Sequence, residues 1–95
     1  MSEILSSAAV EAHLPDLGGW SRDGDWLVRR DQPETFRAAL AWINRVGMLA
    51  EEHDHHPDFH LTGWNRVELR LQSHDVGGLT QRDLDLARAI SQLAR

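Results

Sequence analysis

Two neighbouring segments of the chain alternate apolar and polar residues, which predicts strands with one buried face. In the segment from about 66 to 73, every second residue from Val67 to Leu71 is apolar, and charged or amide side chains lie between them. The shorter segment 58–61 alternates in the same way. Residues 62–65, Thr-Gly-Trp-Asn, are typical of a turn. We therefore expect a hairpin with a short first strand and a longer second strand.

A second hairpin is predicted nearer the start of the chain. Asp23-Gly24 stands between two runs that contain Trp20 and Trp26, and an Asp-Gly pair in such a position favours a tight turn. The two tryptophans are candidates either for a binding site or for packing. Large aromatic residues on hairpins pack in the core or across strands more often than they bind ligands, so we interpret both as packing residues.

A long amphipathic helix is expected from about residue 33 to 53. Asp31 or Gln32 would lie near its cap, with Pro33 at the first helical position. Trp42 lies off the apolar stripe, which leaves two interpretations open, a flank of the core or a subunit contact. The stripe repeats at three- and four-residue spacing and consists of Phe36, Ala39, Leu40, Ile43, Val46, Gly47 and Ala50.

Shorter helices are expected near both ends of the chain. Ser6 or Ser7 would cap the first, and Pro15 would end it. The last would begin after Thr80, with Asp83 reaching back in a capping box, and would run to about residue 93. The order helix, hairpin, long helix, hairpin, helix predicts one α+β domain over residues 1–95.

Composition narrows the class of protein. The 95 residues carry 15 acidic and 10 basic side chains and no basic run longer than Arg29-Arg30, which disfavours a nucleic-acid partner. No segment resembles a signal peptide or a membrane span, and the chain lacks cysteine, so we expect a soluble cytoplasmic protein. Because so short a chain buries only a modest core, self-association is also expected.

Five of the six histidines fall between residues 51 and 83, and this stretch holds the candidate chemistry. The ring of Pro57 forces His56 out of the helical region, so the long helix must end near His53 or Asp54. Adjacent side chains on a strand point to opposite faces, so His55 and His56 can line one pocket only if their backbone is a turn or a helix exit. His74 and Asp83, further along the chain, could converge with them.

A metal site is one interpretation of these histidines. His53 and His55 have the spacing of two ligands on one strand face, yet they stand where a helix is ending, and no carboxylate follows at Phe59 or His60. The sequence also lacks a zinc-binding HExxH motif and a thiolate pair, so we expect no metal. A nucleophilic triad is disfavoured because Ser73, the only serine in the stretch, has no elbow-type glycines around it.

Acid/base catalysis is the remaining interpretation of these histidines. Histidine has an ordinary pKa of about 6.5 and can both give and take protons near neutrality, which suits the addition or removal of water. From spacing alone, an alternative stays open in which the histidines are only surface and cap residues.

A multi-position pattern in this stretch resembles the signature of the pterin-4a-carbinolamine dehydratases, and the resemblance covers roughly Trp20 to Leu93. It implies a two-layer fold, a four-stranded antiparallel sheet with helices packed on one face, and assembly as a homodimer or homotetramer. The segment 73–87, SHDVGGLTQRDLDLA, is also similar in sequence to members of that family. The pattern consists of Glu51-x-x-x-His55-His56-Pro57, followed by Trp64 after six intervening residues, His74 after nine more and Asp83 after eight more.

The resemblance implies that His55, His56 and His74 are the catalytic histidines of a pterin pocket. The implied reaction is the loss of water from a 4a-hydroxytetrahydropterin, which gives a quinonoid dihydropterin and needs neither a metal nor an organic cofactor. We expect His55 and His56 to share the acid and base roles and His74 to orient the hydroxyl side.

Three further residues match substrate-binding positions of the family. Glu51 and Asp83 match acidic positions, although the cap role of Asp83 is by itself a sufficient explanation for that residue. Phe59 falls where members often have a pocket aromatic, which is frequently Trp. The family also includes members that act as dimerisation partners of a homeodomain transcription factor in animals, so a non-catalytic dimerisation or protein-interaction module of the same fold is the alternative.

Overall fold

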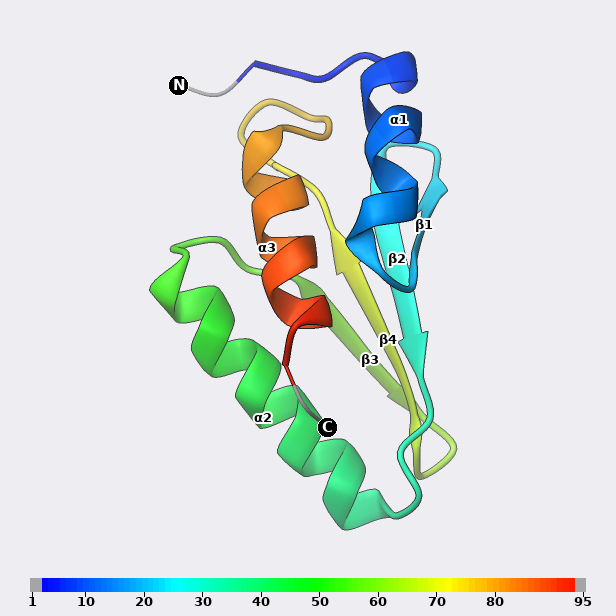
Figure 1. Cartoon of the computed structure of the whole chain (residues 1–95). Coiled ribbons are helices and arrows are strands. Elements are labelled where there is room, and N and C mark those ends of the chain that lie inside the picture. The colour runs from blue at the N-terminus through cyan, green and yellow to red at the C-terminus, as the bar shows by residue number, and fades with distance from the viewer. Residues whose placement is uncertain (1–2, 94–95) are drawn as a thin grey trace.

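Four strands form one antiparallel sheet in the computed structural model, which describes residues 3–93, and all three helices lie on one face of it (Figure 1). The strand order is β1-β2-β4-β3, so the longer strand of the second hairpin is central and β3 is an edge. This confirms the predicted fold class. The elements are α1 (Ser7–Leu17), β1 (Trp20–Asp23), β2 (Trp26–Asp31), α2 (Phe36–Glu52), β3 (Asp58–Thr62), β4 (Arg66–Leu71) and α3 (Gln81–Ser91).

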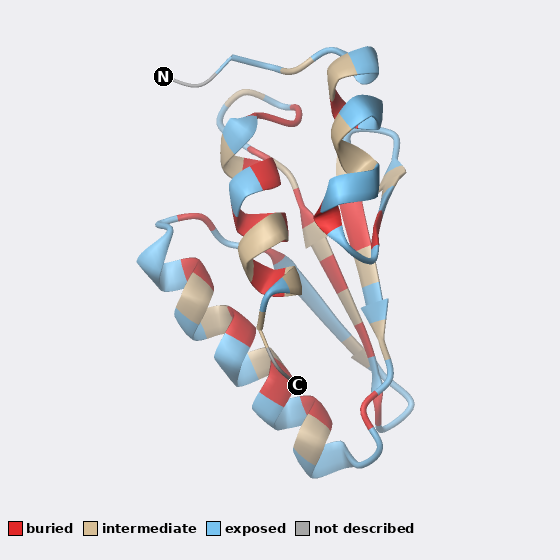
Figure 2. Cartoon of the chain, in the orientation of Figure 1, coloured by how far each residue is buried: buried red, intermediate tan, exposed pale blue. Residues whose placement is uncertain are grey.

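The core lies between the sheet and the helices. β4 alternates exposed or half-buried residues with buried ones, and Leu71 faces Leu27 of β2 across the ladder. Figure 2 shows the resulting bands of buried residues along β2 and β4 and on the helices. Trp20 lies in this core, and its Nε1–H donates to the Ala87 carbonyl at 3.0 Å, so the packing interpretation of Trp20 is correct.

The first two elements depart slightly from expectation. Ser6 caps α1 as expected, but the helix runs through Pro15 to the fully buried Leu17 and ends at Gly18, whose φ is 70°. Near the end of a helix, a proline removes only one intrahelical bond, and the burial of Leu17 offsets that loss. The first hairpin is present, and its two-residue turn is Gly24-Asp25, because Asp23 already pairs with Trp26.

The start of α2 is a correction. The helix begins at Phe36, and Thr35 caps it by accepting a hydrogen bond from the Ala38 amide at 3.0 Å. Asp31 cannot be the cap because it still belongs to β2. Pro33 is buried outside the helix, where its carbonyl accepts a 2.7 Å hydrogen bond from the Asn65 side chain of the second hairpin.

The buried face of α2 is also rotated from the predicted stripe. Trp42 is only 2% exposed and belongs to the core, whereas Leu40 and Phe36 are 47% and 50% exposed. The apolar pattern wraps around more than one face of this helix, and the sheet covers only one of them. Leu40, Phe36 and Met48 therefore form an exposed apolar stripe on α2. The residues of α2 that are buried are Ala39, Trp42, Val46 and Ala50.

The other boundaries lie close to prediction. The hairpin β3–β4 is present, although β4 ends at Leu71 rather than 73, and α3 ends at Ser91 rather than 93. Within residues 3–93, no helix is long and apolar enough to cross a membrane.

Thr35 provides a test of where α2 begins. Replacing Thr35 with Ala removes the side-chain acceptor of the Ala38 amide, so the free energy of unfolding should fall by about 1 kcal/mol. Gln32→Ala should change it by less than about 0.5 kcal/mol, because Gln32 is exposed and outside the helix. Urea denaturation measures both variants, and a larger loss in the Gln32 variant would contradict this placement of the cap.

Candidate active site

The chain leaves α2 through a tight reversal that fixes the two adjacent histidines. His53 caps the helix, and Asp54 adopts a left-handed conformation with φ of 50°. The Asp54 amide donates to the Glu51 carbonyl and the His55 amide donates to the Ala50 carbonyl, each at 3.1 Å, which is the Schellman pattern. The predicted helix exit near His53 or Asp54 is confirmed.

His55 is held by a buried carboxylate. Its Nε2 lies 2.6 Å from Oδ1 of Asp83, and the side chains are 8% and 0% exposed. The other oxygen of Asp83 accepts hydrogen bonds from the Ser73 hydroxyl at 2.7 Å and from the Thr80 amide at 2.9 Å. The capping box predicted at the start of α3 is therefore present, and the same carboxylate also orients His55.

His56 forms a second carboxylate pair on the solvent side. Its Nε2 contacts Oε2 of Glu51, in the last turn of α2. Both side chains are well exposed, in contrast to the buried pair of His55 and Asp83. Neighbouring histidines thus experience different surroundings, one shielded from water and one open to it.

His74 reaches the same region from the turn that follows β4. The backbone of Ser73 anchors this turn, since its amide donates to the Gly78 carbonyl at 3.0 Å and its carbonyl accepts from Gly77 at 2.9 Å. The imidazole is exposed and lies edge-on to the Trp26 ring, with centroids 5.4 Å apart and planes at 68°. Trp26 is thus a packing residue that also contacts the candidate site.

These elements enclose a cleft of about 270 Å³ that brings the three predicted histidines together. Glu51 and Asp83 lie behind two of them as partners. Phe59 is not among the lining residues: it lies on β3 opposite Leu69, 36% exposed. His53 and His60 are exposed, as expected. The lining residues are Asp54, His55, His56, Gln72, His74, Asp75 and Arg82.

An ion pair in the cleft lining was not foreseen from the sequence. Arg82 donates to Asp75 Oδ1 at 2.7 Å, and this hydrogen bond holds the pKa of the Asp75 carboxyl below its ordinary value. The Nε of Arg82 is buried and has no hydrogen-bond partner among residues 3–93. The position of Arg82, directly before the buried Asp83, is a signal that could have been used, because the first turn of α3 faces the turn after β4.

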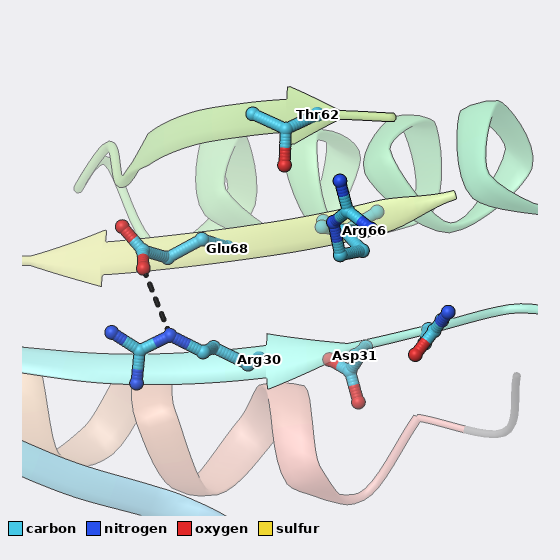
Figure 3. Close-up of a pocket in the computed structure, with 7 residues that line it drawn as sticks. Arg30, Asp31, Thr62, Arg66 and Glu68 are labelled. Atoms are coloured by element: carbon cyan, nitrogen blue, oxygen red, sulfur yellow. Dashed lines mark hydrogen bonds and ion pairs between the residues drawn. The ribbon is translucent and has the colours of Figure 1, made fainter. Parts of the chain in front are cut away.

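A larger hollow of about 320 Å³ lies on the face of the sheet that points away from the helices (Figure 3). Arg30 and Glu68 form an ion pair at 3.0 Å in it, and Thr62 and Arg66 contribute from the second hairpin. No histidine lines it. Because proton transfer near neutrality needs a group that titrates there, the histidine cleft is the better candidate despite its smaller volume.

Residues 3–93 contain no group of three or more histidine, aspartate or glutamate side chains arranged to hold a metal ion. Asp83, Glu51 and Asp75 are instead engaged with His55, His56 and Arg82.

The sequence profile of the family described as pterin 4 alpha carbinolamine dehydratase matches residues 3–93. The chain belongs to this family. A relative from Thermosynechococcus vestitus, provisionally named pterin-4-alpha-carbinolamine dehydratase, is 47% identical over 94 residues. The alignment covers 99% of this chain and 98% of the relative. A relative from Nocardia farcinica with the same provisional name is 46% identical, with 99% of this chain and 98% of the relative covered.

Solved structures show the same fold. A protein from Brucella melitensis described as a transcriptional coactivator/pterin dehydratase superposes with a TM-score of 0.84 at 27% identity, covering 93% of this chain and 95% of that one. A pterin dehydratase-like protein described as a RuBisCO assembly factor superposes with a TM-score of 0.58 at 18% identity, covering 83% of this chain and 96% of that one. At this low identity the likeness shows the fold alone. The family fold thus occurs in proteins described in more than one way.

The hydrogen bonds of the buried Asp83 carboxylate lead to a prediction about stability. Asp83→Ala leaves the buried donors of Ser73, Thr80 and His55 without their acceptor, so the free energy of unfolding should fall by about 3 kcal/mol or more. Ser73→Ala removes one hydroxyl from this network and should cost about 1 kcal/mol. Chemical denaturation measures both.

Asp85→Ala is the matched control, since Asp85 is an exposed acid on the same helix and should change stability by less than about 0.5 kcal/mol. Equal losses for Asp83 and Asp85 would show that the network around Asp83 is not the stabilising feature described above.

Proposed function

We propose that this chain removes water from a 4a-hydroxytetrahydropterin to give a quinonoid dihydropterin, with the histidine cleft as its active site. The observation that carries the proposal is the convergence of His55, His56 and His74 on one cleft, two of them paired with carboxylates. Membership of the dehydratase family supports the substrate class. The reaction would take place in the cytoplasm, in a homodimer or homotetramer.

The pairing of His55 with Asp83 supports its use in proton transfer. A carboxylate only accepts hydrogen bonds, so Nε2 of His55 carries the hydrogen, and Nδ1 is the nitrogen that can take up a proton. Once His55 is protonated, the adjacent Asp83 charge stabilises the imidazolium, as the acid does in a serine-protease triad. Asp83 therefore acts through His55.

The dehydration needs one acid and one base. The bond from C4a to the hydroxyl oxygen breaks, the leaving oxygen receives a proton and departs as water, and the ring nitrogen beside C4a gives a proton to the base. His55 and His56 share these two roles in the proposal, and His74 orients the hydroxyl. Glu51 orients His56 from the solvent side.

Binding of the pterin is assigned to the same cleft. In the proposal Glu51 and Asp83 contribute to substrate binding through His56 and His55, which they contact. Phe59 lies on β3 outside the cleft lining, and the family pattern alone assigns it to substrate binding. Loss of water changes no oxidation state overall, so the proposed reaction uses neither a metal nor an organic cofactor.

The proposal predicts a positional pattern of losses. Alanine at His55, His56 or His74 should lower the rate of carbinolamine dehydration by about 10² to 10⁴, the usual contribution of a positioned acid or base. Alanine at the exposed His53 or His60 should change it less than about threefold, since neither lines the cleft. Purified variants are compared in a direct dehydration assay at several pH values.

Melting temperature and oligomeric state are measured for all five variants, and the assay is repeated with a chelator, which should leave the rate unchanged. Equal losses at the five positions, or losses that follow melting temperature, would remove the histidine assignment. A chelator-sensitive rate restored by one metal would favour metal chemistry instead. A wild-type rate no faster than background would contradict the enzyme itself.

A second candidate function is a non-catalytic interaction module. The exposed apolar stripe on α2 favours it, because apolar side chains gathered on one helix face are typical of protein contacts. The Brucella melitensis structure, described as both coactivator and dehydratase, is consistent with either function in one fold. Activity that requires the three histidines distinguishes the enzyme from the module.

The same stripe predicts self-association. Light scattering at micromolar concentration should report a multiple of the 10.8 kDa chain mass. Leu40→Glu combined with Met48→Glu should lower the mass toward that of one chain, because two charges would enter an apolar contact. Ala12→Glu, an exposed change on α1, is the control and should leave the mass unchanged. A wild-type monomer would contradict the prediction.

A further inference from the structure

The third histidine of the cleft differs from the other two in what holds it. His55 and His56 each contact a carboxylate, whereas His74 has no side-chain hydrogen bond or ion pair within residues 3–93 and instead makes a ring contact with Trp26. We propose that Trp26 is a positioning residue, which sets the orientation of the His74 imidazole for the dehydration. This inference rests on the function proposed above and adds a residue to it.

The geometry is that of a favourable aromatic pair. Centroids 5.4 Å apart and planes at 68° place the rings in the edge-to-face arrangement that aromatic quadrupoles prefer. Trp26 is the first residue of β2 and His74 follows the end of β4, so the contact joins two segments 48 positions apart in the chain. Within residues 3–93, neither His55 nor His56 makes a ring contact of this kind.

The backbone of His74 is fixed, but its ring is not. Ser73 is fully buried and is tied through its hydroxyl to Asp83 and Thr80, so the Cα of the next residue has a defined place. The imidazole itself is exposed, and rotation about its side-chain bonds would otherwise be open to it. The Trp26 ring restricts that rotation, and a restricted imidazole meets the orientation that proton transfer requires.

Trp26 can restrict the imidazole because contacts with neighbouring residues restrict the Trp26 ring in turn. The Arg70 guanidinium of β4 lies over its ring at 5.1 Å, a cation–π distance. Arg70 is in turn within 3.4 Å of Asp23 and 3.7 Å of Glu68. The Gln72 side chain donates to the Asp25 carbonyl at 3.2 Å, which ties the end of β4 to the first hairpin beside Trp26.

A merely structural role for Trp26 is the competing explanation. Trp26 and Val28 share the face of β2 that points away from the helices, and Val28 is only 2% exposed, so the tryptophan could serve as a cover for it. Loss of that cover would lower stability and would affect the rate without regard to His74. The test must therefore measure coupling between the two residues.

A double-mutant cycle measures this coupling. Trp26→Leu keeps an apolar cover on the sheet and should lower kcat for dehydration about three- to tenfold, the range expected for one lost aromatic contact, with KM little changed. Trp26→Phe should restore most of the rate because it keeps an aromatic edge. In a His74→Ala background, Trp26→Leu should have no further effect, since the side chain it positions is gone.

A second readout is independent of activity. In ¹H–¹³C NMR spectra, the His74 ring signals should shift in Trp26→Leu as the ring current of the indole disappears, whereas those of His13, which lies on α1 and makes no ring contact with Trp26, should not. Arg30→Ala, an exposed change on the same sheet face, is the matched control and should leave both the rate and the His74 signals unchanged.

The inference is overturned if Trp26→Leu lowers the rate equally in the wild-type and His74→Ala backgrounds, or if the His74 signals do not move. It also falls if His74→Ala has the wild-type rate, because His74 would then have no part in the reaction. An inactive wild-type protein would instead refute the proposed dehydration, and the positioning role would fall with it. The outcomes thus separate failure of the positioning role from failure of the enzyme.

Discussion

The buried carboxylate of Asp83 is the group on which the fold and the candidate site both depend. One of its oxygens accepts from the Thr80 amide and the Ser73 hydroxyl, and the other contacts His55. It therefore joins the start of α3, the turn after β4 and the exit of α2. A fully buried acid is tolerated only when its charge is met by donors, and here three donors from three segments meet it.

This arrangement explains why the sequence alone predicts the histidines better than their surroundings. Pro57 and the capping-box spacing are local signals, and they correctly predicted the helix exit and the start of α3. The role of Asp83 as a helix cap was also local, whereas its contact with His55 spans 28 positions and depends on how the helices pack. Trp26 beside His74 is likewise a product of sheet pairing.

The same division applies to the fold. Alternation predicted the second hairpin and the face of β4, and the Asp23-Gly24 pair predicted the first hairpin, because each of these signals lies within a few residues. The start of α2 had a local signal in Thr35, directly before Phe36, but Pro33 was interpreted as the first helical residue. Pro33 instead accepts a hydrogen bond from Asn65 of a hairpin about 30 positions away, which the local sequence does not indicate. The buried side of α2 was misjudged because its apolar residues exceed what one sheet face can cover, which leaves Leu40 and Met48 outside.

The backbone of Asp54 has a consequence of its own. A φ of 50° is costly for any residue except glycine, and aspartate accepts that conformation more readily than most. The chain thus places a carboxylate in the cleft lining at a position where a glycine would relieve the backbone. The backbone conformation favours glycine at this position, whereas the acidic charge of the cleft lining depends on aspartate. An engineer who makes the protein more heat-resistant by relaxing this turn would also reduce the negative charge that the cleft presents to its ligand.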